Sequence, residues 1–427
     1  MPTAYTRPRL ALAAVKDLER TSSHLLALIA SWLSAPDETI PQALDAVRQR
    51  LQADLASAPD LVFRPWPGGS QAAGAPSALL VYFDSLISST LLATCLASAA
   101  RAGESAHALA PLQELGEPLA RWSDCLVRLL QGQTLLFVAG SPAAFSLPTA
   151  DPPSRALEVA EIEPAVRGPQ EAFNEAMDTR LGQLRRWLPT PGLCIRTFSL
   201  GSRIATPVHL VFLEDVANET LVGAVEERLL RVRRDMVERT TDLVPYLYER
   251  RWTLFPQVRL TDRVDWVVHE LHRGKCAILL VNDPFAVVLP VTLVDLYQTS
   301  QDYSMSFWEA TLTRLVRLTA TLVSLYLMPL YIALTSVNLD LMPTRLLLTI
   351  AGSREGIPFP PVIEVVIMWV IIETLREAAN RLPQSLATTL GTVGAVVVGT
   401  AIVKAGVVDD IMIVLATLTA VGMFAMP

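Results

Sequence analysis

The chain carries little charge for its length. Only 18% of its 427 residues are charged, against roughly 25% in a typical soluble domain. The shortage is local, because residues 315–427 hold 13 of the 77 charged residues. Three uncharged apolar runs fall in this region: Leu318–Val337, Leu386–Val403 and Ile411–Pro427. A membrane-spanning helix needs about 20 predominantly apolar residues, so the sequence predicts a helical transmembrane domain over residues 306–427.

The sequence also lacks the common catalytic and metal-binding motifs. It contains no Walker loop, GxGxxG, GxSxG or HExxH, each of which places reactive or phosphate-binding groups at a fixed spacing. His269 and His272 fit one helix face, but no third ligand is near them in the sequence. We therefore interpret the two histidines as solvated surface. The prediction is a protein that is not an enzyme, with no metal, no cofactor and no nucleic-acid partner.

Cysteine is scarce, and a secretory signal is missing. The four cysteines show no CxxC spacing, which fits a reducing compartment and argues against a zinc site: Cys95, Cys125, Cys194 and Cys276. The N-terminus reaches a charge at Lys16 before any apolar core of the required length. We therefore expect the residues before the first apolar run to stay in the cytoplasm. Arg314 and Arg317, at the near edge of that run, agree with this orientation.

One hairpin pattern occurs twice. Residues 132–148 read GQTLLFVAGSPAAFSLP, and residues 274–290 read GKCAILLVNDPFAVVLP. In each copy two apolar runs flank a turn cluster, which predicts a β-hairpin. The predicted turn residues are Gly140 and Pro142 in the first copy and Asn282, Asp283 and Pro284 in the second.

The similarity extends upstream from both hairpins through a helical segment. Still further upstream the spacing between the copies is twelve residues shorter, which indicates an insertion near Arg231–Arg250. Self-similarity in a fixed order indicates duplication, and the proline-rich residues 146–155 resemble a linker. We predict an α/β soluble head of two duplicated small α/β units, followed by an α-helical transmembrane bundle. The predicted domains are 1–150, 151–305 and 306–427.

Carboxylates in the apolar region are candidate functional groups. After prolines at 358, 360 and 361, the stretch VIEVVIMWVIIETLREAANRLP predicts a helix with Glu364 near its start. Glu373 and Glu377 share a face, with Arg376 within pairing distance. Ionisable groups at membrane depth are costly unless paired or hydrated, and carboxylate rings suit cation pores. Glu364, Glu373 and Glu377 are therefore ion-path candidates, with Arg376 as their structural partner.

A structural interpretation of the same residues stays open. Glu364 also fits a helix-start acid that interacts with the helix dipole, and Glu373, Arg376 and Glu377 fit a self-neutralised helix end. The glycine-rich run GTVGAVVVG lies in an uncharged segment, where small residues allow membrane helices to approach closely. Gly391, Gly394 and Gly399 are accordingly predicted helix-packing positions.

Seven motifs, in order, resemble one family, the GerA-type spore-germination receptor A subunits: RGPQEAF (167–173), FPQVRLTDRVD (255–265), NDPFAVVLP (282–290), QTSQDYS (298–304), SREGIPFPPVIE (353–364), ETLREAANRLP (373–383) and GTVGAVVVGTAIVKAG (391–406). The resemblance covers roughly residues 154–427. The chain departs at residues 261–265, which read TDRVD where the family usually has Thr-Glu-Arg-Pro-Asp. Family members continue beyond a Phe-x-x-Pro like Phe424–Pro427, so the transmembrane domain is expected to be truncated at its C-terminus.

The resemblance implies a multi-pass protein of the spore inner membrane with a cytoplasmic N-terminal domain. It implies an oligomer that acts as a ligand-gated cation channel and triggers germination in response to small nutrients. The implied partners are the lipid bilayer, a transporter-like B subunit and a lipoprotein C subunit. Three alternatives stay open: the sporulation paralogue called stage V sporulation protein AF, a membrane-anchored signalling scaffold, and a secondary transporter, for which the spans are few and show no repeat.

Overall fold

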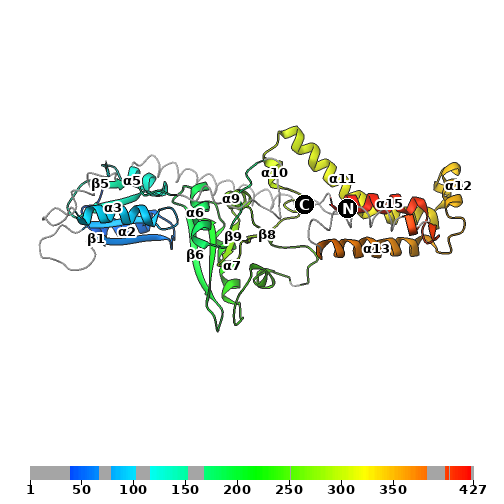
Figure 1. The fold of residues 1–427 in the computed structure, drawn as a ribbon, viewed down its shortest axis with the longest axis horizontal. Coiled ribbons are helices and arrows are strands. Elements are labelled where there is room, and N and C mark those ends of the chain that lie inside the picture. The colour runs from blue at the N-terminus through cyan, green and yellow to red at the C-terminus, as the bar shows by residue number, and fades with distance from the viewer. Residues whose placement is uncertain are drawn as a thin grey trace, which may run out of the picture. The chain divides into compact units, whose positions relative to one another are not determined.

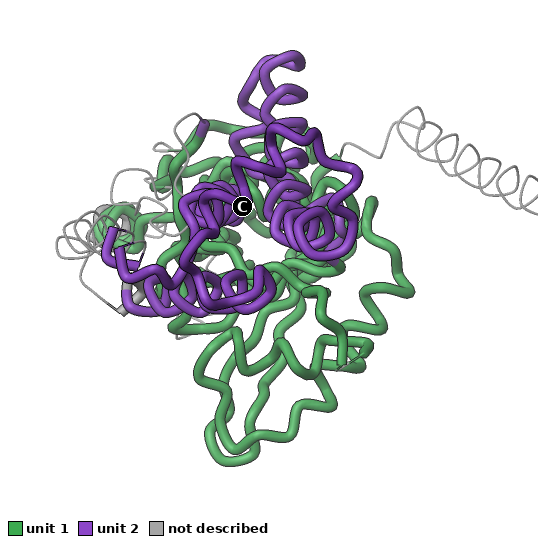
Figure 2. The backbone as a smooth tube through the Cα atoms, turned by 90° about the vertical axis from the view of Figure 1, so that its right-hand side faces the viewer, with its two compact units in different colours: residues 1–164, 169–290 green, residues 165–168, 291–427 purple. Residues whose placement is uncertain are grey.

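The computed structural model describes residues 39–66, 78–101, 116–151, 168–250, 252–381, 400–402 and 404–424. The chain divides into two compact units, shown in different colours in Figure 2. Unit 1 comprises residues 1–164 and 169–290, and unit 2 comprises residues 165–168 and 291–427. Unit 1 contains two β-sheets, and unit 2 contains the long apolar helix α11.

The first sheet of unit 1 has five strands in the order β1-β2-β4-β5-β3. Each pair of neighbouring strands is antiparallel. The strands, labelled in part in Figure 1, are β1 (Leu61–Trp66), β2 (Ala78–Phe83), β3 (Glu117–Leu119), β4 (Thr134–Val138) and β5 (Ala144–Leu147).

Helices cover both faces of this sheet. Successive strand residues point to opposite faces, and β2 is buried along its whole length. Helices α2 (Leu44–Asp54) and α5 (Trp122–Leu130) pack on the face that includes Leu79 and Val81. Helix α3 (Ser89–Arg101) packs on the opposite face, against Leu80 and Tyr82. The sheet therefore has an apolar core on each side.

The second sheet repeats this plan. Its order is β6-β7-β9-β10-β8, again antiparallel throughout. Helices α6 and α9 cover one face, and α7 and α8 cover the other. The elements are α6 (Met177–Trp187), β6 (Leu193–Leu200), β7 (Thr206–Leu213), α7 (Glu219–Leu230), η1 (Thr240–Asp242), α8 (Val244–Leu247), β8 (Arg259–Thr261), α9 (Val264–His272), β9 (Cys276–Leu280) and β10 (Ala286–Leu289).

The predicted duplication agrees with these elements. Helices α5 and α9 begin at Trp122 and Val264, 142 positions apart, and the strands of the two central hairpins keep the same spacing. Strand β2 and helix α3 match β7 and α7 at a spacing of 130 residues. In the second repeat, η1 and α8 lie where the change of spacing predicts an insertion.

Both copies of the hairpin pattern carry glycine or asparagine at the same two positions, and the backbone conformation there explains why. Gly132 and Gly274, at equivalent positions after α5 and α9, have φ of 85° and 80°. A Cβ there would lie 3.0 Å from the carbonyl oxygen of Leu86 and 2.9 Å from that of Val216, respectively. Gly140 and Asn282, in the predicted hairpin turns, also have positive φ, at 78° and 63°. Glycine adopts this conformation freely and asparagine tolerates it.

The second hairpin turn is fixed by buried polar groups. Arg180 of α6 is fully buried and donates to the carbonyl oxygens of Leu280 at 2.9 Å, Asp283 at 2.5 Å and Phe285 at 3.0 Å. The Asp283 carboxylate accepts the backbone N–H of Thr240 at 2.5 Å and that of Phe285 at 3.0 Å. Burial lowers the pKa of Arg180 to about 10, although Asp283 opposes the shift. These contacts give the turn residues a structural role.

A buried ion pair joins the two repeats. Arg185 of α6 donates to both oxygens of Asp60, at 2.7 and 2.6 Å, and lies over the ring of Phe83. Ser85 donates a further hydrogen bond to Asp60 at 2.6 Å. Beside this pair, the backbone N–H of Ile195 donates to the carbonyl of Ser57 at 2.7 Å. The repeats therefore form one compact unit.

Unit 2 is helical in its described part. One helical stretch, Phe307–Val337, is long and apolar enough to cross a membrane, and Asp410–Met423 is a shorter apolar helix. Most of the predicted apolar run Leu386–Val403 lies outside the described residues. The elements are α10 (Ser300–Tyr303), α11 (Phe307–Ile332), the π-helical turn η2 (Ala333–Val337), η3 (Leu339–Leu341), α12 (Thr344–Ser353), α13 (Pro361–Arg381) and α15 (Asp410–Phe424).

Candidate functional site

A buried carboxylate lies at the start of α13. Glu364 sits in the first turn of this helix and has no exposed surface. Its Oε1 accepts a hydrogen bond from Arg354, which follows α12, at 2.9 Å. Its Oε2 accepts the backbone N–H of Asp409 at 3.3 Å. The same guanidinium of Arg354 also donates to the carbonyl of Phe359, at 3.0 Å, and so fixes the loop that leads into α13.

A second buried carboxylate adjoins Glu364. Asp409 precedes α15 and is 1% exposed. Its Oδ2 accepts the hydroxyl of Tyr331 from α11 at 2.9 Å, and its Oδ1 accepts the backbone N–H of Met412 at 2.5 Å. The second bond satisfies a free N–H at the start of α15, as a helix cap does. We call Glu364, Arg354, Asp409 and Tyr331 the polar cluster.

The polar cluster is unusual because it lies among apolar side chains. Met328, Met368 and Met412 belong to the same buried core. The cluster contains two carboxylates and one guanidinium, and Glu364 is the carboxylate that pairs with Arg354, so the ionised cluster has an excess of negative charge. Buried charge is costly unless it is paired and hydrogen-bonded, and in a membrane such groups are functional candidates. The arrangement can fix four helical elements together.

The other predicted carboxylates lie elsewhere on α13. Glu373 accepts a hydrogen bond from Arg376 at 2.6 Å, and both side chains are about 40% exposed. Glu377 is exposed as well. Nine residues of helix separate Glu373 from Glu364, roughly 14 Å along the axis. The structure thus joins Glu373 with Arg376, as the spacing predicts, and places Glu364 with partners far away in the sequence.

The remaining predicted positions fall into two groups. The helix-packing glycines Gly391, Gly394 and Gly399 lie outside the described residues. His272 is exposed and His269 half-buried, with the pKa of His269 lowered by burial. Throughout the described ranges, no three His, Cys, Asp or Glu side chains gather closely enough to hold a metal ion.

The sequence interpretation missed a second buried pair, which joins α10 to α11. Arg317 donates to Asp302 at 2.9 Å and also to the carbonyl of Tyr297. Burial favours a higher pKa for Asp302, but the hydrogen bonds from Arg317 and from the backbone of Thr299 outweigh it and hold the pKa below its ordinary value. This pair connects the segment before α11 to the helix itself. From the sequence, Arg317 was interpreted only as a positive charge that favours a cytoplasmic location for the residues before the first apolar run.

The family comparison identifies a model that matches residues 49–427: the Bacillus/Clostridium GerA spore germination protein. The chain is 34% identical over 310 residues to spore germination protein A1 of Bacillus subtilis (strain 168), covering 73% of this chain and 64% of that protein. It is 30% identical over 385 residues to spore germination protein B1 of the same organism, covering 88% and 79%. The chain thus spans part of the length of each relative.

Among solved structures, the chain is similar to the crystal structure of the N-terminal domain of the A subunit of the Bacillus megaterium spore germinant receptor GerK3. The identity is 21% and the TM-score is 0.46. The match covers 60% of this chain and 97% of that chain.

Proposed function

The chain belongs to the GerA family of Bacillus/Clostridium spore germination proteins, and we propose that it is the A subunit of a nutrient-germinant receptor that conducts cations. We place it in the spore inner membrane as a multi-pass protein, with unit 1 in the cytoplasm. It works there as a homo-oligomer together with a transporter-like B subunit and a lipoprotein C subunit. Nutrient binding to the receptor opens the path, and cation release triggers germination.

Exposed carboxylates on α13 are the observation that carries this proposal. Glu373 and Glu377 lie in a helical unit that also contains the apolar stretch Phe307–Val337. A protein that only anchors a head to the membrane has no need of such groups, because each raises the cost of burial. A cation channel does need them, since rings of carboxylates attract cations into a pore.

The carboxylates of α13 divide into two roles. Glu373 and Glu377 are accessible on the single chain, so in an oligomer they can form a ring, with Arg376 as the partner that limits their charge. Glu364 is fully buried within its own subunit. We therefore revise the expectation of three equivalent groups: Glu364 anchors the start of α13 against Asp409 and Arg354, and the path follows Glu373 and Glu377.

Ion flux tests the channel. The complete receptor is reconstituted in liposomes, and cation release is measured after nutrient addition. The variant Glu373→Gln with Glu377→Gln should lower the flux about tenfold, equivalent to roughly 1.4 kcal/mol, without loss of assembled receptor. The matched control is Glu355→Gln, an exposed carboxylate after α12, which should leave the flux unchanged. A normal flux in the double variant refutes the ion path.

The same assay separates the alternatives. Coupled nutrient uptake without a cation current indicates a secondary transporter, and neither activity indicates a scaffold. Glu364→Gln removes the fully buried anion that pairs with Arg354, whose side chain is 20% exposed, and breaking one partner of a buried pair typically costs about 3 kcal/mol or more. We expect a loss of assembled receptor. A Glu364→Gln receptor that assembles normally but does not conduct would instead place Glu364 on the ion path.

An accessible cysteine is needed to measure, by chemical labelling, on which side of the membrane unit 1 lies. Cys276 is fully buried, and burial raises the pKa of its thiol to about 12. It should therefore react with no impermeant reagent from either side of the membrane. A cysteine in place of the exposed Trp252 is the better probe. Its rapid labelling from outside intact cells would overturn the cytoplasmic placement of unit 1.

A further inference from the structure

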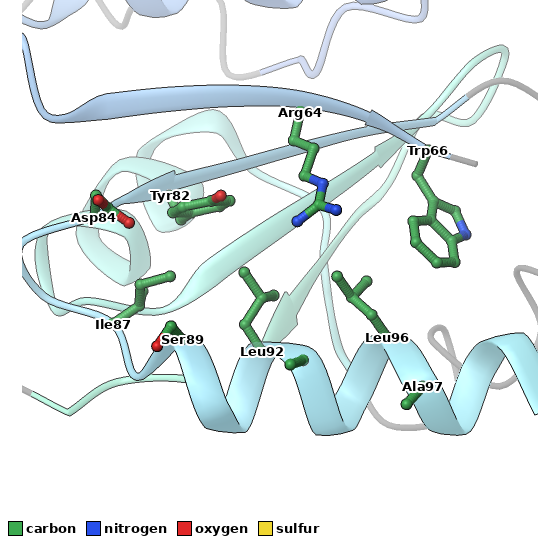
Figure 3. Close-up of a pocket in the computed structure, with 10 residues that line it drawn as sticks. Arg64, Trp66, Tyr82, Asp84, Ile87, Ser89, Leu92, Leu96 and Ala97 are labelled. Atoms are coloured by element: carbon green, nitrogen blue, oxygen red, sulfur yellow. The ribbon is translucent and has the colours of Figure 1, made fainter. Parts of the chain in front are cut away.

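A groove lies between the first sheet and α3. Its volume is about 410 Å³, within the range of small-molecule sites. Figure 3 shows Arg64 and Trp66 of β1 and Tyr82 of β2 above the apolar side chains of Leu92 and Leu96 on α3. The groove thus combines an apolar floor with polar groups from an edge strand.

Two polar groups at the groove have no partner among the described residues. The Arg64 side chain is exposed and forms neither an ion pair nor a hydrogen bond within that part of the chain. The indole N–H of Trp66 is buried without an acceptor. A ligand with an anionic group near β1 would neutralise Arg64.

The second repeat shows what normally occupies this position. Arg196 lies opposite Leu210 in its strand pair, just as Arg64 lies opposite Leu80. Its guanidinium donates to Glu226 of α7 at 2.6 Å and lies 5.1 Å from the ring centre of Phe212. The equivalents of Phe212 and Glu226 in the first repeat are Tyr82 and Leu96, both at a spacing of 130 residues.

At the helix position that faces the strand arginine, the two repeats therefore differ by one carboxylate. The first repeat keeps the arginine and the aromatic ring, but it replaces the glutamate by leucine. We propose that the groove binds a small monocarboxylate with an apolar body. The ligand carboxylate takes the place of Glu226 and accepts hydrogen bonds from Arg64, and the ligand body packs on Leu92 and Leu96. Charge-assisted hydrogen bonds to a guanidinium are well suited to this geometry.

Asp84 restricts the ligand further. It follows β2 at the other end of the groove, four residues from the position opposite Arg64, roughly 13 Å along the strand. Its carboxylate repels a second anionic group, and it accepts hydrogen bonds from a donor. The groove therefore selects a single negative charge at the Arg64 end.

Binding is measured by calorimetry with the full chain in lipid nanodiscs, and empty nanodiscs supply the blank. The probes are phenylacetate, hexanoate and 4-methylpentanoate, each paired with its neutral amide. We expect saturable binding of at least one carboxylate, at least tenfold tighter than its amide. No saturable binding of any of the three, or equal binding of acid and amide, overturns the proposal.

Variants assign the site. Arg64→Gln should weaken binding at least tenfold, whereas Arg196→Gln, the matched change in the second repeat, should leave it unchanged. Leu96→Glu supplies from α3 the carboxylate that α7 supplies in the second repeat, and it should abolish binding while the fold is retained. Binding that survives Arg64→Gln, or that falls equally in Arg196→Gln, overturns the proposal.

Discussion

The two repeats of unit 1 support their central hairpins differently. In the first repeat Val47 of α2 lies in the apolar core, and the turn residue Gly140 donates its N–H to the carbonyl of Gln42 at 2.9 Å. In the second repeat the equivalent helix position is Arg180, which binds three carbonyl oxygens of the hairpin. The same sheet topology can therefore be stabilised by an apolar residue or by a buried, hydrogen-bonded arginine at this helix position.

The difference shows where the stability of each repeat originates. An apolar residue in the first repeat needs no particular partner, because hydrophobic burial is non-directional. A buried arginine needs every one of its acceptors, because an unpaired buried charge is strongly destabilising. The second hairpin should therefore be fixed more rigidly and should also be more sensitive to single substitutions.

The largest effect is expected for Arg180→Met. The change leaves three buried carbonyl oxygens without their donor, and each such loss typically costs about 1–3 kcal/mol. We expect unit 1 to lose about 4 kcal/mol of unfolding free energy, measured by chemical denaturation. Arg48→Met, an exposed position on α2, is the control and should change the stability by less than about 1 kcal/mol. Equal losses in both variants would contradict the proposed difference between the hairpins.

The next largest effect concerns the link between the repeats. Asp60→Asn removes the charge that faces Arg185, whose side chain is 3% exposed. Breaking one partner of a buried pair costs about 3 kcal/mol or more, and the two repeats should then unfold in separate steps. Asp45→Asn on the exposed side of α2 is the matched control. A single, unchanged unfolding transition in Asp60→Asn would show that the ion pair does not couple the repeats.

A smaller effect, a pH dependence of the stability of unit 1, should come from His209 in the second repeat. Burial lowers the pKa of His209 below its ordinary 6.5, and Arg180 contributes in the same direction, whereas Asp60 and Asp178 oppose it. Below pH 6.5 the unfolded chain binds a proton that the folded chain does not bind, so stability falls with falling pH. The slope is at most about 1.4 kcal/mol per pH unit.

The equivalent residue in the first repeat is Leu79, which cannot titrate. Unfolding curves between pH 7.5 and 5.5 for the wild type and for His209→Leu measure the contribution. The variant should have a flatter pH profile, although His269 adds a second, similar titration. If the two profiles coincide, His209 does not carry the pH dependence.

The smallest effect concerns the hairpin turns. Gly140 has φ of 78° and open space around the position of a Cβ, so Gly140→Ala costs only backbone strain, about 1 kcal/mol. Gly140→Asn introduces the residue that the second repeat carries, and it should cost less, because asparagine visits the left-handed region more readily than alanine. Melting temperatures of the two variants provide the measurement. A larger loss for asparagine than for alanine would mean that the turns are not equivalent.

Several features follow from local sequence alone. Apolar runs around Gly140-Ser141-Pro142 and Asn282-Asp283-Pro284 predict both hairpins, because turn conformation depends on a few neighbouring residues. The constant spacing predicts the duplicated units and the position of the insertion. The capacity of Glu373 to pair with Arg376 also follows from helix periodicity. The uncharged apolar run Leu318–Val337 predicts the larger part of the long helix α11.

The partners of buried charges could not be predicted in this way. Glu364 meets Asp409 across 45 residues and Arg185 meets Asp60 across 125, and neither pair leaves a periodic signal. Arg180 resembles a solvated helix residue until the hairpin packs over it. Tyr331 and Arg354 likewise gain their roles only when α11, α13 and α15 come together. Local sequence determines which elements form, whereas packing between distant segments decides which charges are buried and what they bind.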